Sequence, residues 1–172
     1  PVTGVQTCAL PISGMAKLET LLPHLPDSVQ PDLRDADAVR RHAIVLDLVL
    51  GPRTDWFDGE SLELLQQQCW QVTQQSNRVG LRLLGEKPLQ RAAGFQGREL
   101  PSEGTALGAL QVPANGQPVL FLADHPLTGG YPVIGCVAPH HLDLAAQLPP
   151  GVFVRFKVMA PFAEIPLEGA GA

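Results

Sequence analysis

The chain lacks an excess of basic residues. Among its 172 residues, 12 lysines and arginines stand against 17 aspartates and glutamates, for a net charge of −5. This balance argues against nucleic acid and anionic membrane surfaces as partners, because both require a basic footprint. Long apolar runs are also lacking, since charged or turn residues interrupt every stretch before it reaches the length of a membrane span.

Cysteine is scarce. It occurs at Cys8, Cys69 and Cys136, without the paired spacing of a metal site. So few thiols suit a reducing compartment, and we expect a cytoplasmic protein. Cys69 and Cys136 have apolar neighbours in the sequence, so we expect them to be core residues and not nucleophiles. We expect no metal site, because the adjacent His140 and His141 would point in different directions from a helix and form its solvated start.

Two common catalytic signatures are missing. No GxxxxGK[ST] stretch occurs, so an autonomous P-loop nucleotide site is not supported. Ser102 lacks the GxSxG setting of a serine-hydrolase nucleophile. The segment between Arg98 and Arg155 contains neither lysine nor arginine. An anion bound in that segment would therefore need backbone N–H groups, Arg78, or another polypeptide.

The two ends of the chain stand apart from the rest. Val2–Ile12, VTGVQTCALPI, matches the in-frame translation of a common short-read sequencing adapter. We expect residues 1–13 to be an artefact with no part in the fold, the alternative being a natural tail. Residues 14–42, with several prolines and scattered acids, indicate a linker or the remnant of a preceding module. Residues 161–172 end in small side chains and are expected to fray.

Residues 43–160 carry the pattern of a mainly β domain. Apolar and β-branched stretches predict strands at 43–50, 70–73, 80–84, 119–123, 133–137 and 152–158. Thr54 or Asp55 is expected to cap a helix whose apolar face extends to Cys69, and Pro139 to begin a second short helix. Many short strands with tight turns predict a β-barrel with short peripheral helices.

Four motifs follow one another in this domain. They are SNRVG at 76–80, SEG at 102–104, GALQVPANGQPV at 108–119 and LADHPLTGGYP at 122–132. Together they resemble the carboxyltransferase-domain family, which includes the C component of 5-oxoprolinase and the second component of allophanate hydrolase. The resemblance implies a cyclophilin-like β-barrel for residues 43–160, and another module ahead of it in a complete member.

The polar residues of these motifs form the predicted site. A positioned carboxylate can orient or deprotonate a substrate N–H, and the resemblance implies catalytic roles for Arg78, Glu103 and Asp124. Amide side chains suit a planar N–C=O group such as a lactam or ureido ring. The predicted substrate-binding residues are Asn77, Gln111, His125, Thr128, Gly129, Gly130 and Tyr131. Arg78 is expected to hold a carboxylate or phosphate, Asp124 the ring N–H, and the glycine pair an oxyanion.

The same residues also have structural interpretations. Asp124 could cap the turn after a buried strand, and Glu103 could be the partner of Arg78. The pair Gly129–Gly130 could mark a tight turn that needs positive φ. Tyr131 could pack at the mouth of the barrel. The sequence leaves these alternatives open.

The resemblance implies part of the C component of an ATP-dependent 5-oxoprolinase, which opens 5-oxoproline to glutamate together with A-like and B-like partner proteins. ATP would bind the complex and not a site in this chain, and this piece alone is expected to be inactive. A second interpretation is biotin-dependent carboxyl transfer to urea or a related amide. A third is a non-enzymatic binding or regulatory module that contacts a kinase or its inhibitor. Leu127 departs from the family pattern, in which a second threonine commonly precedes Thr128. This departure removes a hydroxyl group from the predicted pocket, so the sequence does not determine the substrate.

Overall fold

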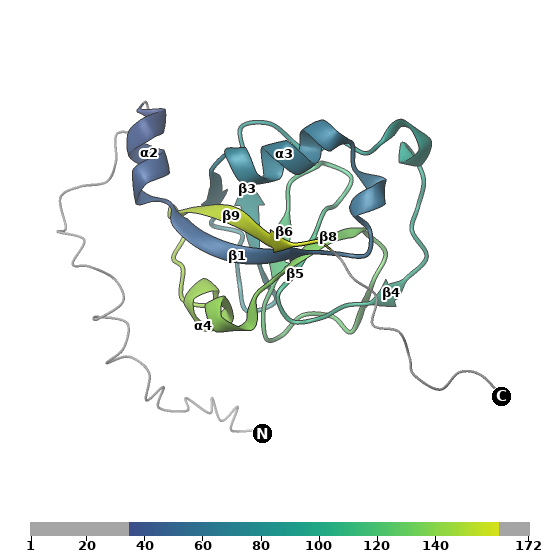
Figure 1. Cartoon of the computed structure of the whole chain (residues 1–172). Helices are drawn as coiled ribbons and strands as arrows, with labels where there is room; N and C mark the ends of the chain where they lie inside the picture. Colours follow the sequence, from purple (N-terminus) through teal and green to yellow (C-terminus); the bar gives the residue numbers. More distant parts are fainter. Residues whose placement is uncertain (1–34, 162–172) are drawn as a thin grey trace, which may run out of the picture.

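The computed structural model describes residues 35–161, and a closed β-barrel forms its centre (Figure 1). Around the barrel the strands follow the order β1-β8-β5-β6-β3-β2-β9. They are β1 (Ile44–Leu50), β2 (Trp70–Val72), β3 (Gly80–Leu84), β5 (Ala109–Gln111), β6 (Val119–Phe121), β8 (Val133–Val137) and β9 (Phe153–Ala160). A separate two-stranded sheet pairs β4 (Glu103–Gly104) with β7 (Thr128–Gly129). The prediction of a mainly β barrel is confirmed.

The first and last strands close the barrel. They run parallel, with Ile44 opposite Val154 and Leu48 opposite Val158, whereas the other barrel pairs are antiparallel. Closure leaves no barrel strand with an unpaired edge. Strand β9 alternates as its sequence predicts, because Val154 and Phe156 are buried and Lys157 is exposed.

Apolar side chains fill the barrel and the space below the helix that covers it. The largest fully buried ones are Trp70, Phe156, Leu46, Leu48, Leu65, Leu83, Leu110, Leu120 and Ile134. Helix α3 (Gly59–Gln67) packs against β9 and lies over one side of the barrel (Figure 1). The indole N–H of Trp70 donates to the carbonyl of Leu65 at 3.1 Å, and this bond joins α3 to the barrel.

The start of α3 differs from the prediction. Thr54 and Asp55 lie in a separate 3-10 turn, η1 (Thr54–Trp56), whose Trp56 is buried. Asp58 caps α3, since its carboxylate accepts from the backbone N–H of Ser61 at 2.7 Å. Cys69 lies beyond the end of the helix. The prediction was wrong because Thr54, Asp55 and Asp58 can all cap a helix, and in the structure Asp58 makes the capping hydrogen bond while Trp56 of η1 is buried.

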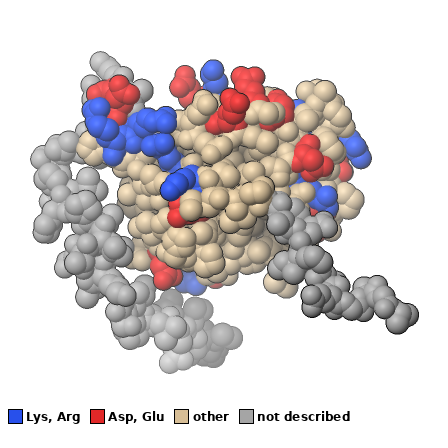
Figure 2. Space-filling model, viewed as in Figure 1, with Lys and Arg blue, Asp and Glu red and all other residues tan. Residues whose placement is uncertain are grey.

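The remaining helical elements are short. They are α2 (Ala36–His42), η2 (Ala93–Phe95), η3 (Pro139–His141) and α4 (Leu142–Ala145). The helix predicted from Pro139 is confirmed as η3 followed by α4. On the face shown in Figure 2, basic side chains gather over α2 and acidic ones over α3, while much of the remaining surface carries no charge.

Several predictions lie outside the described residues. They concern the adapter-like residues 1–13, residues 14–34, and the tail from residue 162. Within residues 35–161, no helix has the length and apolar composition needed to cross a membrane.

Candidate functional site

The small sheet β4–β7 brings two of the motifs together. Glu103 pairs with Gly129 and Gly104 with Thr128. The backbone N–H of Thr105 then donates to the carbonyl of Leu127 at 3.0 Å. The SEG motif therefore lies beside the TGG part of LADHPLTGGYP, although more than twenty residues separate them in the sequence.

Gln111 shapes the glycine-rich loop from inside. Its side chain is only 6% exposed, and its Nε2 donates to the carbonyl of Tyr131 at 3.1 Å. A Cβ atom on Gly129 would lie 2.6 Å from this Nε2, and one on Gly130 would lie 3.2 Å from the carbonyl of Leu100. Neither glycine has a positive φ. The positive-φ interpretation is therefore wrong, and close packing explains the glycines instead.

Glu103 has a partner that the sequence did not indicate. The Nε of Arg53 donates to Oε2 of Glu103 at 3.0 Å, and its Nη2 donates to Oε1. Each side chain is about one-third exposed. The hydrogen bonds from Arg53 lower the pKa of Glu103, so the carboxylate stays ionised. The interpretation of Glu103 as the partner of Arg78 is wrong.

Arg78 instead pairs with Asp124. Its Nε lies 2.7 Å from Oδ2 of Asp124 and its Nη2 lies 3.3 Å from Oδ1. The backbone N–H of Asp124 also donates to the carbonyl of Arg78 at 3.1 Å. The hydrogen bond from Arg78 lowers the pKa of Asp124, which weakens this carboxylate as a base. The pair joins the SNRVG and LADHP motifs at one end of the barrel.

Asn77 belongs to the same end. Its Oδ1 accepts from the backbone N–H of Val79 at 2.9 Å and so holds the turn between β2 and β3. Asn77 and Arg78 line a pocket of about 410 Å³, whose lining also includes Ala146 and Leu148 after α4. These contacts give Asn77 a structural role in addition to its place at the pocket.

A larger pocket, of about 900 Å³, lies beside the glycine-rich loop and is lined by Gly130 and Tyr131. Arg91, Arg98 and Glu99 also line it. The sequence analysis did not predict a role for Arg91 or Arg98, because both precede the segment 99–154, which has no lysine or arginine and carries most of the motifs. The one indication in the sequence was that Arg98 is the last basic residue before this segment.

Aromatic rings hold both arginines in place. The guanidinium of Arg91 lies 5.3 Å from the ring centre of Trp56, and its Nη1 donates to the carbonyl of Arg98 at 2.6 Å. The guanidinium of Arg98 lies 5.2 Å from the ring centre of Phe95. Stacked guanidinium groups keep hydrogen-bonding edges free for a carboxylate or a phosphate. The pocket thus has the cationic groups that the motif segment lacks.

Of the ten predicted site residues, Asn77 and Arg78 line the smaller pocket, Gly130 and Tyr131 line the larger one, and the other six line neither. The Nδ1 atom of His125 lies 2.8 Å from the carbonyl oxygen of Pro126, and its ring stacks on Phe121 with 5.9 Å between the ring centres. Thr128 is exposed in β7. The predicted residues therefore divide between the Arg78 end and the glycine-rich loop.

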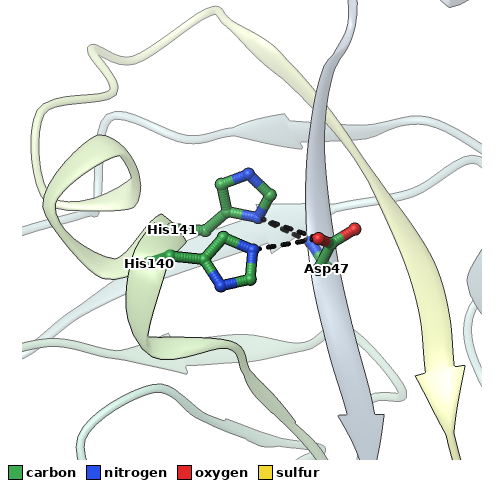
Figure 3. A group of neighbouring side chains, drawn as sticks. All are labelled: Asp47, His140 and His141. Atoms are coloured by element: carbon green, nitrogen blue, oxygen red, sulfur yellow. Dashed lines mark hydrogen bonds and ion pairs between the residues drawn. The ribbon is translucent and has the colours of Figure 1, made fainter.

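A third group of polar side chains joins η3 to β1 (Figure 3). The Nε2 of His140 lies 3.0 Å from Oδ2 of Asp47, and the Nδ1 of His141 lies 3.9 Å from the same oxygen. The expectation that the two histidines diverge is wrong. In the 3-10 turn after Ala138 their ring centres lie 4.4 Å apart, and both rings face Asp47.

The two cysteines within residues 35–161 are free thiols and half-buried. Burial raises the pKa of Cys69 and the pKa of Cys136. A thiol with a raised pKa forms little thiolate near neutral pH. This environment agrees with the expectation that neither cysteine is a nucleophile.

Known proteins are similar to this chain in sequence and in fold. The chain is 41% identical over 106 residues to the C component of 5-oxoprolinase from Escherichia coli, covering 62% of this chain and 33% of that protein. It is 30% identical over 146 residues to urea amidolyase of Saccharomyces cerevisiae, covering 81% of this chain and 8% of that protein. The crystal structure of the K. lactis urea amidolyase superposes with a TM-score of 0.61 at 28% identity, over 67% of this chain and 7% of that one.

The chain thus spans about a third or less of these relatives. Residues 11–158 match the family described as carboxyltransferase domain, subdomain A and B. Because this match covers most of the sequence and the described residues carry all four motifs, the chain belongs to the carboxyltransferase-domain family.

Proposed function

We propose that this chain is part of the C component of a 5-oxoprolinase, which acts with A-like and B-like partner proteins to open 5-oxoproline to glutamate in an ATP-dependent reaction. The likeness to the E. coli protein supports this proposal. The observation that carries it is the pair of arginines at the larger pocket. 5-Oxoproline is a lactam that bears a carboxylate, whereas urea is uncharged.

The charges at the pocket favour an anionic substrate. Two arginines and one glutamate, Glu99, line it, so the lining carries a net positive charge. Arg91 and Arg98 would bind the substrate carboxylate through charge-assisted hydrogen bonds. The hydroxyl of Tyr131 and the amide of Asn115, which also line the pocket, would bind the N–C=O group of the ring.

The other predicted residues have complementary roles in this proposal. Gln111 and Gly129 would position the loop that carries Tyr131. The Arg78–Asp124 pair would face the preceding module or the B-like partner. ATP would bind to the complex, since this sequence has no P-loop.

The test uses the full-length protein together with its partners and measures ATP-dependent release of glutamate from 5-oxoproline. We expect Arg98→Ala to raise KM for 5-oxoproline by at least about tenfold, because a charge-assisted hydrogen bond contributes roughly 1.5–3 kcal/mol. The control is Arg82→Ala, an exposed arginine on β3 that lines neither pocket. An unchanged KM in the Arg98 variant would contradict the assignment.

Carboxyl transfer to urea or a related amide, with biotin as the carrier, is the second candidate. The structural likeness to urea amidolyase favours it. In this case the assembled complex would hydrolyse ATP in response to urea, avidin would block the reaction, and 5-oxoproline would release no glutamate. The same preparation therefore distinguishes the two activities.

A further inference from the structure

We propose that Asp47, His140 and His141 bind a divalent transition-metal ion of the zinc type, which fastens η3 to β1. One ligand atom from each residue lies within 4.8 Å of the others. The group is formed by segments more than ninety residues apart in the sequence. Neither pocket includes any of the three residues, so this site is distinct from the one proposed for 5-oxoproline.

The distances suit a small ion at the centre of the group. In a tetrahedral zinc site, bonds of about 2.0–2.1 Å place neighbouring ligand atoms roughly 3.3 Å apart. Here Oδ2 of Asp47 lies 3.0 Å from Nε2 of His140 and 3.9 Å from Nδ1 of His141. All three ligand atoms lie within 4.8 Å of one another, so an ion would bind after the imidazole rings rotate toward Asp47 and His141 gives up its hydrogen bond from the N–H of Asp47.

Backbone hydrogen bonds fix the positions of β1 and η3 around this group. The N–H of Ala138 donates to the carbonyl of Asp47 at 2.9 Å, which fixes the start of η3 against β1. The N–H of Asp47 donates to Nδ1 of His141 at 2.9 Å, so the lone pair of that nitrogen faces β1. An ion bound there would exchange this neutral hydrogen bond for a coordinate bond.

The ligand set indicates the class of ion. Two imidazole nitrogens and one carboxylate oxygen suit Zn²⁺, Co²⁺, Ni²⁺ or Cu²⁺, whereas Mg²⁺ and Ca²⁺ prefer oxygen ligands alone. The side chains of Asp47 and His141 are 19% and 24% exposed, while that of His140 is 62% exposed. Water can therefore reach the ion and complete its coordination.

One neighbouring charge opposes binding. Lys157 lies opposite Asp47 in the parallel β1–β9 register, so its ammonium group is a cation next to the proposed site. A cation at the site would be repelled by this group. Removal of the lysine charge should therefore tighten metal binding, an effect that loss of packing would not produce.

The experiment titrates the full 172-residue chain, free of any affinity tag and treated with chelator, with ZnCl₂ by calorimetry. The Cys8→Ser background is used because a thiol also binds zinc. We expect one ion per chain and a rise in melting temperature with added zinc. Co²⁺ serves as a second probe, since its visible absorption reports direct coordination.

The variants distinguish a site from adventitious binding. We expect Asp47→Asn and His140→Ala each to weaken zinc binding by at least about tenfold, and Lys157→Ala to strengthen it. The control is His42→Ala, which removes an exposed histidine in α2. Circular dichroism confirms that each variant is folded, and Asp47→Asn keeps the shape of the side chain. Absence of saturable binding to the folded chain, or binding by the Asp47 and His140 variants equal to that of the parent, would overturn the proposal.

Discussion

The buried amide of Gln111 occupies the space that a side chain on Gly129 would need. The Nε2 atom lies 2.6 Å from the position of a Cβ atom on Gly129, and it also donates to the carbonyl of Tyr131. One side chain thus fixes two points of the loop beside the larger pocket. Close packing against Gln111 therefore explains the glycine at position 129, and a contact with the carbonyl of Leu100 explains Gly130.

Gly129→Ala is expected to destabilise the fold by about 1–3 kcal/mol, since the new methyl group must displace Gln111 and break its hydrogen bond. Urea unfolding measures the change in the free energy of unfolding. Gly104→Ala is the matched control, because it lies in the same small sheet and no atom lies within 4 Å of its Cβ position. Equal stability of the two variants would show that the contact is dispensable.

Arg53→Ala is expected to reduce stability at neutral pH by about 1 kcal/mol or less, because the ion pair with Glu103 is partly exposed to solvent. Folding lowers the pKa of Glu103, so the pair stabilises the folded chain above the unfolded pKa of about 4.3. This contribution is lost as the pH falls through the folded pKa.

The measurement is the free energy of unfolding of both proteins across this pH range. The difference between wild type and Arg53→Ala should shrink on acidification. A difference that stays constant down to the lowest pH at which both proteins fold would rule out the ion pair as its source.

Asp124→Asn is expected to reduce glutamate release by the full complex by at least about tenfold, because the Arg78–Asp124 pair is proposed to face the preceding module or the B-like partner and a hydrogen bond to a charged group contributes roughly 1.5–3 kcal/mol. It should leave stability almost unchanged, because the side chains of Arg78 and Asp124 are 84% and 48% exposed. Thermal melting and activity are measured on the same preparation. The control is Asp35→Asn, which breaks another exposed ion pair, with Arg41. Full activity of the Asp124 variant would remove this residue from the site.

Cys69 and Cys136 are expected to react with a thiol reagent at pH 8 more slowly than a free cysteine does, since burial raises the pKa of each thiol. The Cys8→Ser variant confines the measurement to these two residues. Unfolding in urea should restore the rate of a free thiol. Rapid labelling of the folded chain would contradict the buried environment.

Much of the barrel could be predicted from local pattern. The alternation from Val152 to Val158 and the apolar runs at 43–50 and 133–137 match β9, β1 and β8 in the structure. The start of α3 could not be predicted, because Thr54, Asp55 and Asp58 are all suitable caps. In the structure Asp58 makes the capping hydrogen bond, whereas Thr54 and Asp55 lie in η1.

The sequence could not predict which charged residues form pairs. Arg53 and Glu103 are 50 residues apart, and Arg78 and Asp124 are 46 apart. A local sequence pattern does not indicate which carboxylate an arginine will pair with when the two residues lie about 50 positions apart in the sequence. The same holds for His140 and His141, whose shared partner Asp47 lies on the first strand.

The sequence by itself determined six of the seven barrel strands, all except β5, together with the order of the motifs and, through them, the family, because these depend on side-chain alternation and on local residue types. The tertiary structure decided which polar groups meet. Pairing of β1 with β8 brings η3, which follows β8 directly, against β1, and the β4–β7 pairing brings Glu103 beside the glycine-rich loop. These contacts join residues that are distant in the sequence, so they depend on how the strands pair and pack and not on local residue patterns.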